Sequence, residues 1–93
     1  MPSKPTWWTV LDAMPAWWPM VWVGPWQRLL GRHHDNADAL SRGAVIDGLR
    51  AWYRKGKNDK DVSCKVLCAL LIGTDADLIA TALAVAALEK EKA

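Results

Sequence analysis

The sequence contains no apolar run long enough to cross a membrane. A transmembrane helix needs about 20 consecutive apolar residues, and the apolar stretch at 14–23 is shorter and contains two prolines. The stretches at 66–73 and 78–88 are separated by Asp75 and Asp77. Residues 1–8 also lack the apolar core and small-residue cleavage site of a secretory signal. We therefore expect neither a membrane span nor a signal peptide.

Cysteine and histidine are scarce, with two of each in the chain. On a helix, Cys64 and Cys68 lie one turn apart, and a disulfide between them would require local distortion. Reduced thiols favour a cytoplasmic location. The metal-ligand candidates are weak, because adjacent histidines rarely reach one ion and the spacings are not those of zinc sites; they are His33, His34, Cys64 and Cys68. We expect no metal and no cofactor.

The sequence also lacks a catalytic motif. It has no glycine-rich phosphate loop, and its paired carboxylates, Asp75 and Asp77, are placed to cap a helix. Ser63 has no evident general base. The net charge of +2 is too small to indicate a nucleic-acid partner by itself. These absences predict a protein that is not an enzyme.

Helical patterning is what the sequence does contain. Composition is ordinary for a globular protein, at 52% apolar and 24% charged residues, and the length predicts a single domain over 1–93. We expect an all-α fold, a small helical bundle in which a Pro/Trp-rich segment of short helical turns packs across three longer helices. The lead-in covers 1–5, the Pro/Trp-rich segment 6–31, and the helical frame 36–91, with helices at about 36–55, 62–72 and 75–91.

Polar residues that cap helices mark the expected helix starts, and glycines mark two of the ends. Thr6 precedes a short helix from Trp7 to about Met14, and Gly56 and Gly73 follow two of the longer helices. The other expected caps are Asp35 or Asn36, Asp59 or Asp61, and Thr74 with Asp77 three residues later.

The helical wheel predicts which faces are buried. Val45, Leu49 and Trp52 form one stripe, and Gly48 beside it leaves room for another helix to approach closely. Every residue from Val66 to Ile72 is apolar, which predicts a helix buried nearly all round.

Six of the seven tryptophans lie between Trp7 and Trp26, in a stretch interrupted by Pro15, Pro19 and Pro25. A core, a partner surface and a membrane-interface anchor each account for such a cluster. Adjacent residues on a helix point about 100° apart, so one ring of a tandem pair faces a core more easily than two. We therefore expect at least one or two rings to stay partly exposed. The predicted partner-binding residues are Trp17, Trp18, Trp22 and Trp26, with Arg28 and Arg32 as a polar rim.

The sequence thus favours a small protein-binding module that binds another protein or a second copy of itself. An inhibitor or adaptor of the type carried by phages and mobile elements would fit this description. The main alternative is a peripheral membrane protein that uses the Trp/Pro segment as an interfacial anchor.

A second alternative is nucleic-acid binding through the basic stretch 50–65, because cations beside aromatic rings bind single strands by charge and stacking. The patch comprises Arg50, Arg54, Lys55, Lys57 and Lys60. The position of Trp52 on the predicted core face and the interrupting Asp59 and Asp61 favour a solvated helix end instead.

The segment Ser41–Arg50, SRGAVIDGLR, resembles the second helix of ribbon-helix-helix DNA-binding proteins. The likeness covers about ten residues. That family has a short strand and a first helix directly upstream, where this chain has the proline-broken Trp segment. We therefore carry over neither the DNA-contacting strand nor the function.

Overall fold

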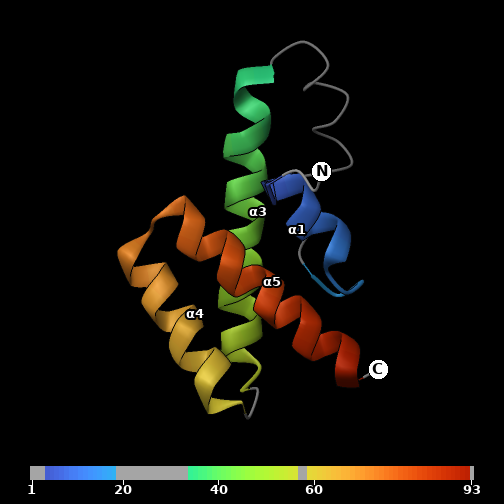
Figure 1. Cartoon of the computed structure of the whole chain (residues 1–93), viewed down its shortest axis with the longest axis vertical. Helices are drawn as coiled ribbons and strands as arrows, with labels where there is room; N and C mark the ends of the chain where they lie inside the picture. Colours follow the sequence, from blue (N-terminus) through green and yellow to red (C-terminus); the bar gives the residue numbers. More distant parts are fainter. Residues whose placement is uncertain (1–3, 19–33, 57–58, 93) are drawn as a thin grey trace.

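The computed structural model describes residues 4–18, 34–56 and 59–92, and these form four helices without a strand among them (Figure 1). The helices are α1 (Trp7–Ala13), α3 (His34–Arg54), α4 (Lys60–Ile72) and α5 (Asp75–Lys92). The predicted all-α fold class is confirmed. Ser41–Arg50 lies in the middle of α3, which is 21 residues long.

Most helix ends follow the expected capping residues. Thr6 caps α1 through a reciprocal pair of hydrogen bonds with Thr9, and the Asp59 carboxylate accepts a hydrogen bond from the Val62 N–H at the start of α4. Gly56 and Gly73 adopt left-handed backbone angles, with φ of 68° and 74°, which glycine adopts without steric cost. These caps are local hydrogen-bonding signals, and they were readable from the sequence.

The expected start of α3 was wrong. The helix begins at His34, so Asp35 and Asn36 lie within its first turn and neither precedes it as a cap. Residues of capping type also occur inside first turns, and no apolar periodicity upstream of Ala37 fixes the start of the helix.

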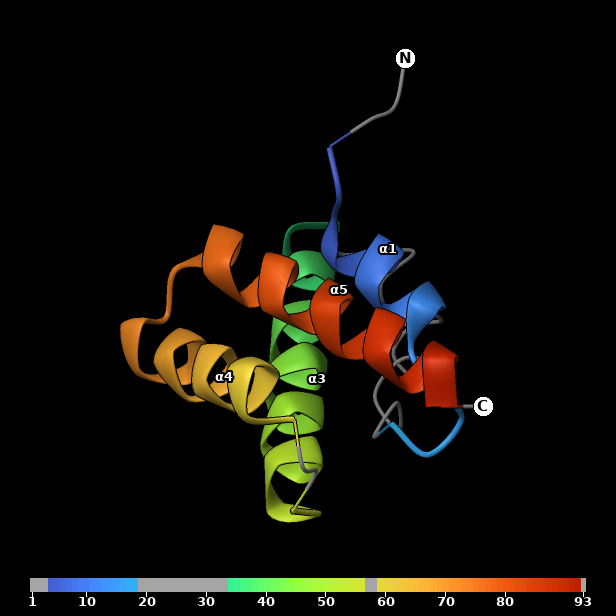
Figure 2. The ribbon, with the colours of Figure 1, turned by 60° about the horizontal axis from the view of Figure 1, so that its bottom comes forward.

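Helix α3 forms the centre of the fold (Figures 1 and 2). Helices α1 and α4 lie on opposite sides of α3, and α5 crosses α3 and contacts the other three helices. The predicted stripe is confirmed, because Val45, Leu49 and Trp52 are fully buried. The core they join includes Trp7, Val10, Leu11, Trp18, Ala44, Val66, Ala69, Leu78, Ala82 and Val85.

Gly48 is a point of close approach, as the sequence predicted, but the group that approaches is a side chain. The indole ring of Trp18 lies directly on the Gly48 backbone, so that a Cβ atom at position 48 would sit 1.6 Å from Cε2 of that ring. The absence of a side chain at Gly48 therefore creates the space into which Trp18 packs.

The prediction that Val66 to Ile72 is buried all round was wrong. Only Val66 and Ala69 of α4 are buried, whereas Leu71 is 78% exposed and Ile72 is 62% exposed. The reason is the position of α4, which lies at one side of the described fold (Figure 1) and, among the described helices, contacts α3 and α5. Its inner side meets those two helices, and its outer side meets none of the described elements.

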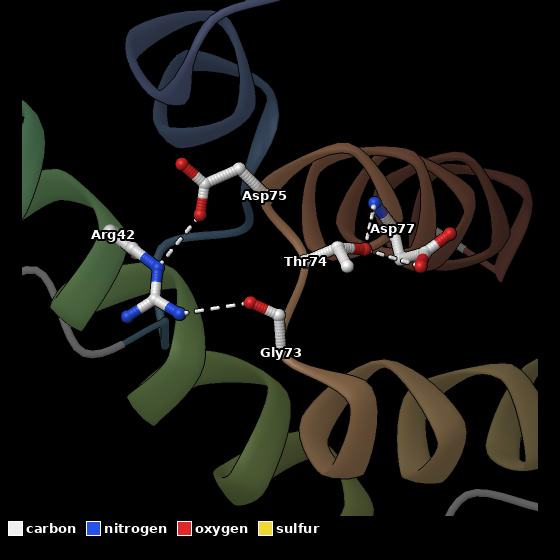
Figure 3. Close-up of polar contacts among 5 residues, drawn as sticks. All are labelled: Arg42, Gly73, Thr74, Asp75 and Asp77. Carbon is white, nitrogen blue, oxygen red and sulfur yellow. Dashed lines mark hydrogen bonds and ion pairs between the residues drawn. The ribbon is translucent and has the colours of Figure 1, made fainter.

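Arg42 joins α3 to the turn between α4 and α5 (Figure 3). Its Nε donates to Asp75 Oδ1 at 2.9 Å, and its Nη2 donates to the carbonyl oxygen of Gly73 at 3.1 Å. Next to these contacts, the Asp77 N–H donates to Thr74 Oγ1 at 3.4 Å, and the Thr74 hydroxyl donates to Asp77 Oδ2. The Thr74 cap of α5 is therefore confirmed.

We expect Arg42→Ala to lower the free energy of unfolding by about 1 kcal/mol. The ion pair is exposed, with side-chain exposures of 41% and 63%, so it adds roughly 0–1 kcal/mol. The part-buried bond to Gly73 adds roughly 0.5–1.5 kcal/mol more. Urea unfolding followed by circular dichroism measures the loss. The control is Arg50→Ala at an exposed position of the same helix. An equal loss in both variants would contradict a stabilising role for the contacts of Arg42 with Asp75 and Gly73.

Candidate docking surface

The adjacent tryptophans divide between the core and the surface, as the sequence predicted. Trp7 and Trp18 are buried, whereas their neighbours Trp8 and Trp17 are partly exposed. Trp18, at 2% exposure, is part of the core, and its predicted place on a partner-binding surface is corrected. The predicted contact residues Trp22, Trp26, Arg28 and Arg32 lie outside the described residues.

Trp17 is held between its neighbour and a lysine. Its ring centroid lies 5.6 Å from that of Trp18 with the planes tilted by 46°, and the Lys55 ammonium group lies 3.8 Å from the Trp17 centroid. A cation over an indole face is attracted by the quadrupole of the ring. These contacts tie Trp17, in the Pro/Trp-rich segment 6–31, to Lys55, the residue that follows α3.

The basic patch is only partly assembled in the described residues. Arg50, Arg54 and Lys60 are exposed, and Lys55 packs on Trp17; Lys57 lies outside the described residues. Trp52 offers no stacking surface, because its ring is buried and its Nε1 donates to Glu89 Oε1 at 2.9 Å. The expected place of Trp52 in the core is thus confirmed.

Two of the four weak metal candidates, Cys64 and Cys68, lie in the part of the chain that the structure describes. Cys64 and Cys68 are exposed free thiols, and no group of three or more potential ligands is found among the described residues. His33 and the side chain of His34 lie outside that part. The Cys64 thiol next to Cys68 raises the pKa of Cys68 above its ordinary value, because a second negative charge there is unfavourable and the two thiols share a hydrogen bond.

An exposed apolar surface covers the outer side of α4, and we call it the α4 face. On the helical wheel its members fall on one side, opposite the buried Val66 and the half-buried Leu70. Four of the five lie in the last two turns of the helix, so the surface is continuous. The members of the α4 face are Cys64, Leu67, Cys68, Leu71 and Ile72.

Beside the α4 face, a groove of about 300 Å³ runs between α4 and α5. We call it the α4–α5 groove. Two of the residues that line it are charged, Lys65 on α4 and Asp77 on α5. The remaining lining residues are Cys68, Ala69, Ile72, Ala80, Thr81 and Ala84.

A second hollow of about 590 Å³ lies between α5 and the end of α1. Its lining is mainly alanine, proline and leucine, with Asp12, Glu89 and Lys90 among the lining residues. It contains no nucleophile beside a base, so its chemistry does not indicate a catalytic site.

Sequence reasoning did not identify the α4 face as a surface. The signal was present in the uninterrupted apolar run from Val66 to Ile72, but such a run is equally typical of a helix buried by its own fold. The decision between the two depends on how many neighbouring helices surround α4, and that is a tertiary property.

Comparison of the chain with models of protein families, with curated proteins and with solved structures gave no match. Among the helices that the structure describes, none has the length and apolar character needed to cross a membrane.

Proposed function

We propose that this chain is a small, non-enzymatic protein-binding module that docks through the α4 face and the adjoining α4–α5 groove. The observation that carries this proposal is the exposure of Leu71 and Ile72, at 78% and 62%, in consecutive positions of one helix. Contiguous exposed apolar patches on small domains usually mark a contact site.

The energetic argument concerns what these side chains contribute to folding. Burying a leucine or isoleucine side chain stabilises a fold by roughly 1.5–3 kcal/mol relative to leaving it in water. Leu71 and Ile72 supply little of this to the isolated chain, because they remain mostly exposed. A partner that covers them recovers it, and the small residues of the α4–α5 groove let a partner helix approach closely.

The Pro/Trp-rich segment supports the same class of function to a smaller extent. Trp17 is partly exposed at the surface, and docking through Trp22 and Trp26 stays a prediction. Among the described residues, the α4 face is the largest exposed grouping of apolar side chains, with Leu67, Leu71 and Ile72 making up three of the four large exposed hydrophobic residues.

A photo-crosslinking amino acid placed at position 71 tests the proposal. We expect a covalent adduct with a protein when the chain is irradiated in its native cells, because position 71 lies at the centre of the exposed apolar surface. The matched control places the same group at position 50, an exposed site on α3. The proposal fails if position 71 gives no adduct, or gives the same adducts as position 50.

A further inference from the structure

We infer that Cys64 and Cys68 of α4 form a two-thiolate site that binds a soft, two-coordinate metal ion of the Cu(I) class. The site lies within the α4 face, but it goes beyond the proposed function, because it needs no protein partner. Three properties of the pair support this assignment, and they are the closeness of the two thiols, the spacing of their Cβ atoms and the chemistry of the donors.

The two thiols are neighbours on an exposed surface. Residues four apart on a helix lie on the same face, one turn from each other, and both cysteines are exposed free thiols. The charge on Cys64 raises the pKa of Cys68, and a hydrogen bond between the two thiols adds to the effect. Both effects require the sulfur atoms to lie close together, so a single ion from solvent can contact both.

The helical spacing of the pair suits a bridging ion better than a disulfide. Cβ atoms four residues apart on a helix are about 5–6 Å from each other, whereas a disulfide needs about 3.5–4.5 Å. A direct S–S bond would therefore have to draw the Cβ atoms together by about 1–2 Å. A metal ion instead inserts two bonds between the sulfurs, each about 2.3 Å long in zinc sites. Rotation of the two side chains then closes the site while α4 stays helical.

The donors select the kind of ion. Thiolates are soft ligands, and among single ions they favour Cu(I) and Zn²⁺. A structural zinc site uses four ligands, and no group of three or more potential ligands is found among the described residues. Cu(I) is satisfied by two thiolates in a near-linear arrangement. Leu67 and Leu71, exposed on the same face, add no oxygen donor of the kind that Mg²⁺ or Ca²⁺ requires.

Binding at this site changes no oxidation state. The Cys64 and Cys68 thiols each release a proton to solvent, and two Cu–S bonds replace the two S–H bonds. Copper stays Cu(I) throughout, and both sulfurs stay at the thiolate level. The site therefore needs no oxidant or reductant as a co-reactant.

Titration of the purified, reduced chain with Cu(I) in the absence of oxygen tests the site, with bicinchoninate as a coloured competitor for the ion. We expect one Cu(I) per chain, at an affinity that does not depend on the concentration of the chain. Cys64→Ser and Cys68→Ser should each weaken binding roughly 100-fold or more, because the second Cu–S bond is then no longer an intramolecular one. Circular dichroism should show the same helical content before and after loading.

The matched control keeps two thiols in the chain but changes their spacing. The double variant Asp61→Cys/Cys64→Ser places the thiols at positions 61 and 68, which are both exposed. They lie about 10 Å apart along the helix, and two metal–sulfur bonds of about 2.3 Å cannot span that distance. This variant should bind Cu(I) as weakly as the single serine variants do.

Three outcomes overturn the inference. They are wild-type affinity in either single serine variant, equal binding by wild type and the spacing variant, and a ratio of one Cu(I) to two chains, which would show an ion held between molecules. The titration uses the chain alone, so its failure leaves the proposed docking function standing. A lack of adducts from position 71 would remove the docking function and leave the metal site standing.

Discussion

Gly48→Ala is expected to lower the free energy of unfolding by about 2–4 kcal/mol, although alanine is the better helix former. Helix propensity alone predicts a gain of about 1 kcal/mol in the interior of a helix. The added Cβ, however, would lie 1.6 Å from Cε2 and 1.9 Å from Cζ2 of Trp18. The indole must leave its site, and the stabilisation from its burial is lost with it. For a chain of this size, the melting temperature should fall by about 10–20 °C.

The same substitution in a Trp18→Leu background separates the two effects. Trp18→Leu alone destabilises the fold by leaving a cavity, but it removes the ring atoms that the new Cβ would meet. Gly48→Ala should then be neutral or stabilising by up to about 1 kcal/mol, because only the helix propensity remains. Urea unfolding of the four proteins gives the coupling energy. Equal losses in both backgrounds would show that Trp18 does not occupy the space above Gly48.

Trp52→Ala is expected to remove about 3–5 kcal/mol of stability, a large part of the roughly 5–15 kcal/mol available to a domain of this kind. The Trp52 ring is fully buried between the helices, and its Nε1 donates to Glu89 Oε1 at 2.9 Å. The substitution therefore opens a large cavity and also removes the polar link from α3 to the last turns of α5. We expect the transition monitored by circular dichroism to shift to much lower urea or to be lost.

The adjacent aromatic residue is the matched control. Tyr53 is 44% exposed on the same turn of α3, so Tyr53→Ala should change the stability by less than about 1 kcal/mol. Trp52→Phe should lie between the two, because it keeps most of the apolar volume and loses the hydrogen bond to Glu89. Losses of similar size for Trp52→Ala and Tyr53→Ala would contradict the buried position of Trp52.

The parts of the fold that could be predicted are those set by local chemistry. Thr6, Asp59 and Thr74 cap helices because their side chains accept hydrogen bonds from nearby backbone N–H groups, and such bonds depend on neighbouring residues alone. The buried stripe of α3 followed from its 3.6-residue period in the same way. The start of α3 was missed because its first residues are polar and carry no periodic signal.

The candidate site was not predictable to the same degree. The apolar run of α4 gives no periodicity by which an outer face could be distinguished from an inner one, so the exposure of Leu71 became visible only once α4 was placed at the edge of the fold. Trp18 was assigned to a binding surface because its chemistry suits one, yet the space above Gly48 holds it in the core. Both differences arise from contacts between segments far apart in the sequence.

The two glycines with left-handed backbone angles, Gly56 and Gly73, lie just after α3 and just after α4. Their positions bear on which residues of α4 tolerate substitution. Helix α4 lies between these two glycines in the sequence, and it contributes only Val66 and Ala69 as buried residues. The outward positions can therefore accept substitutions that leave the buried core intact. Under the proposed function, the residues of α4 that would contact a partner differ from those that hold the helix in the fold, and a laboratory library confined to its outer positions should retain a folded scaffold.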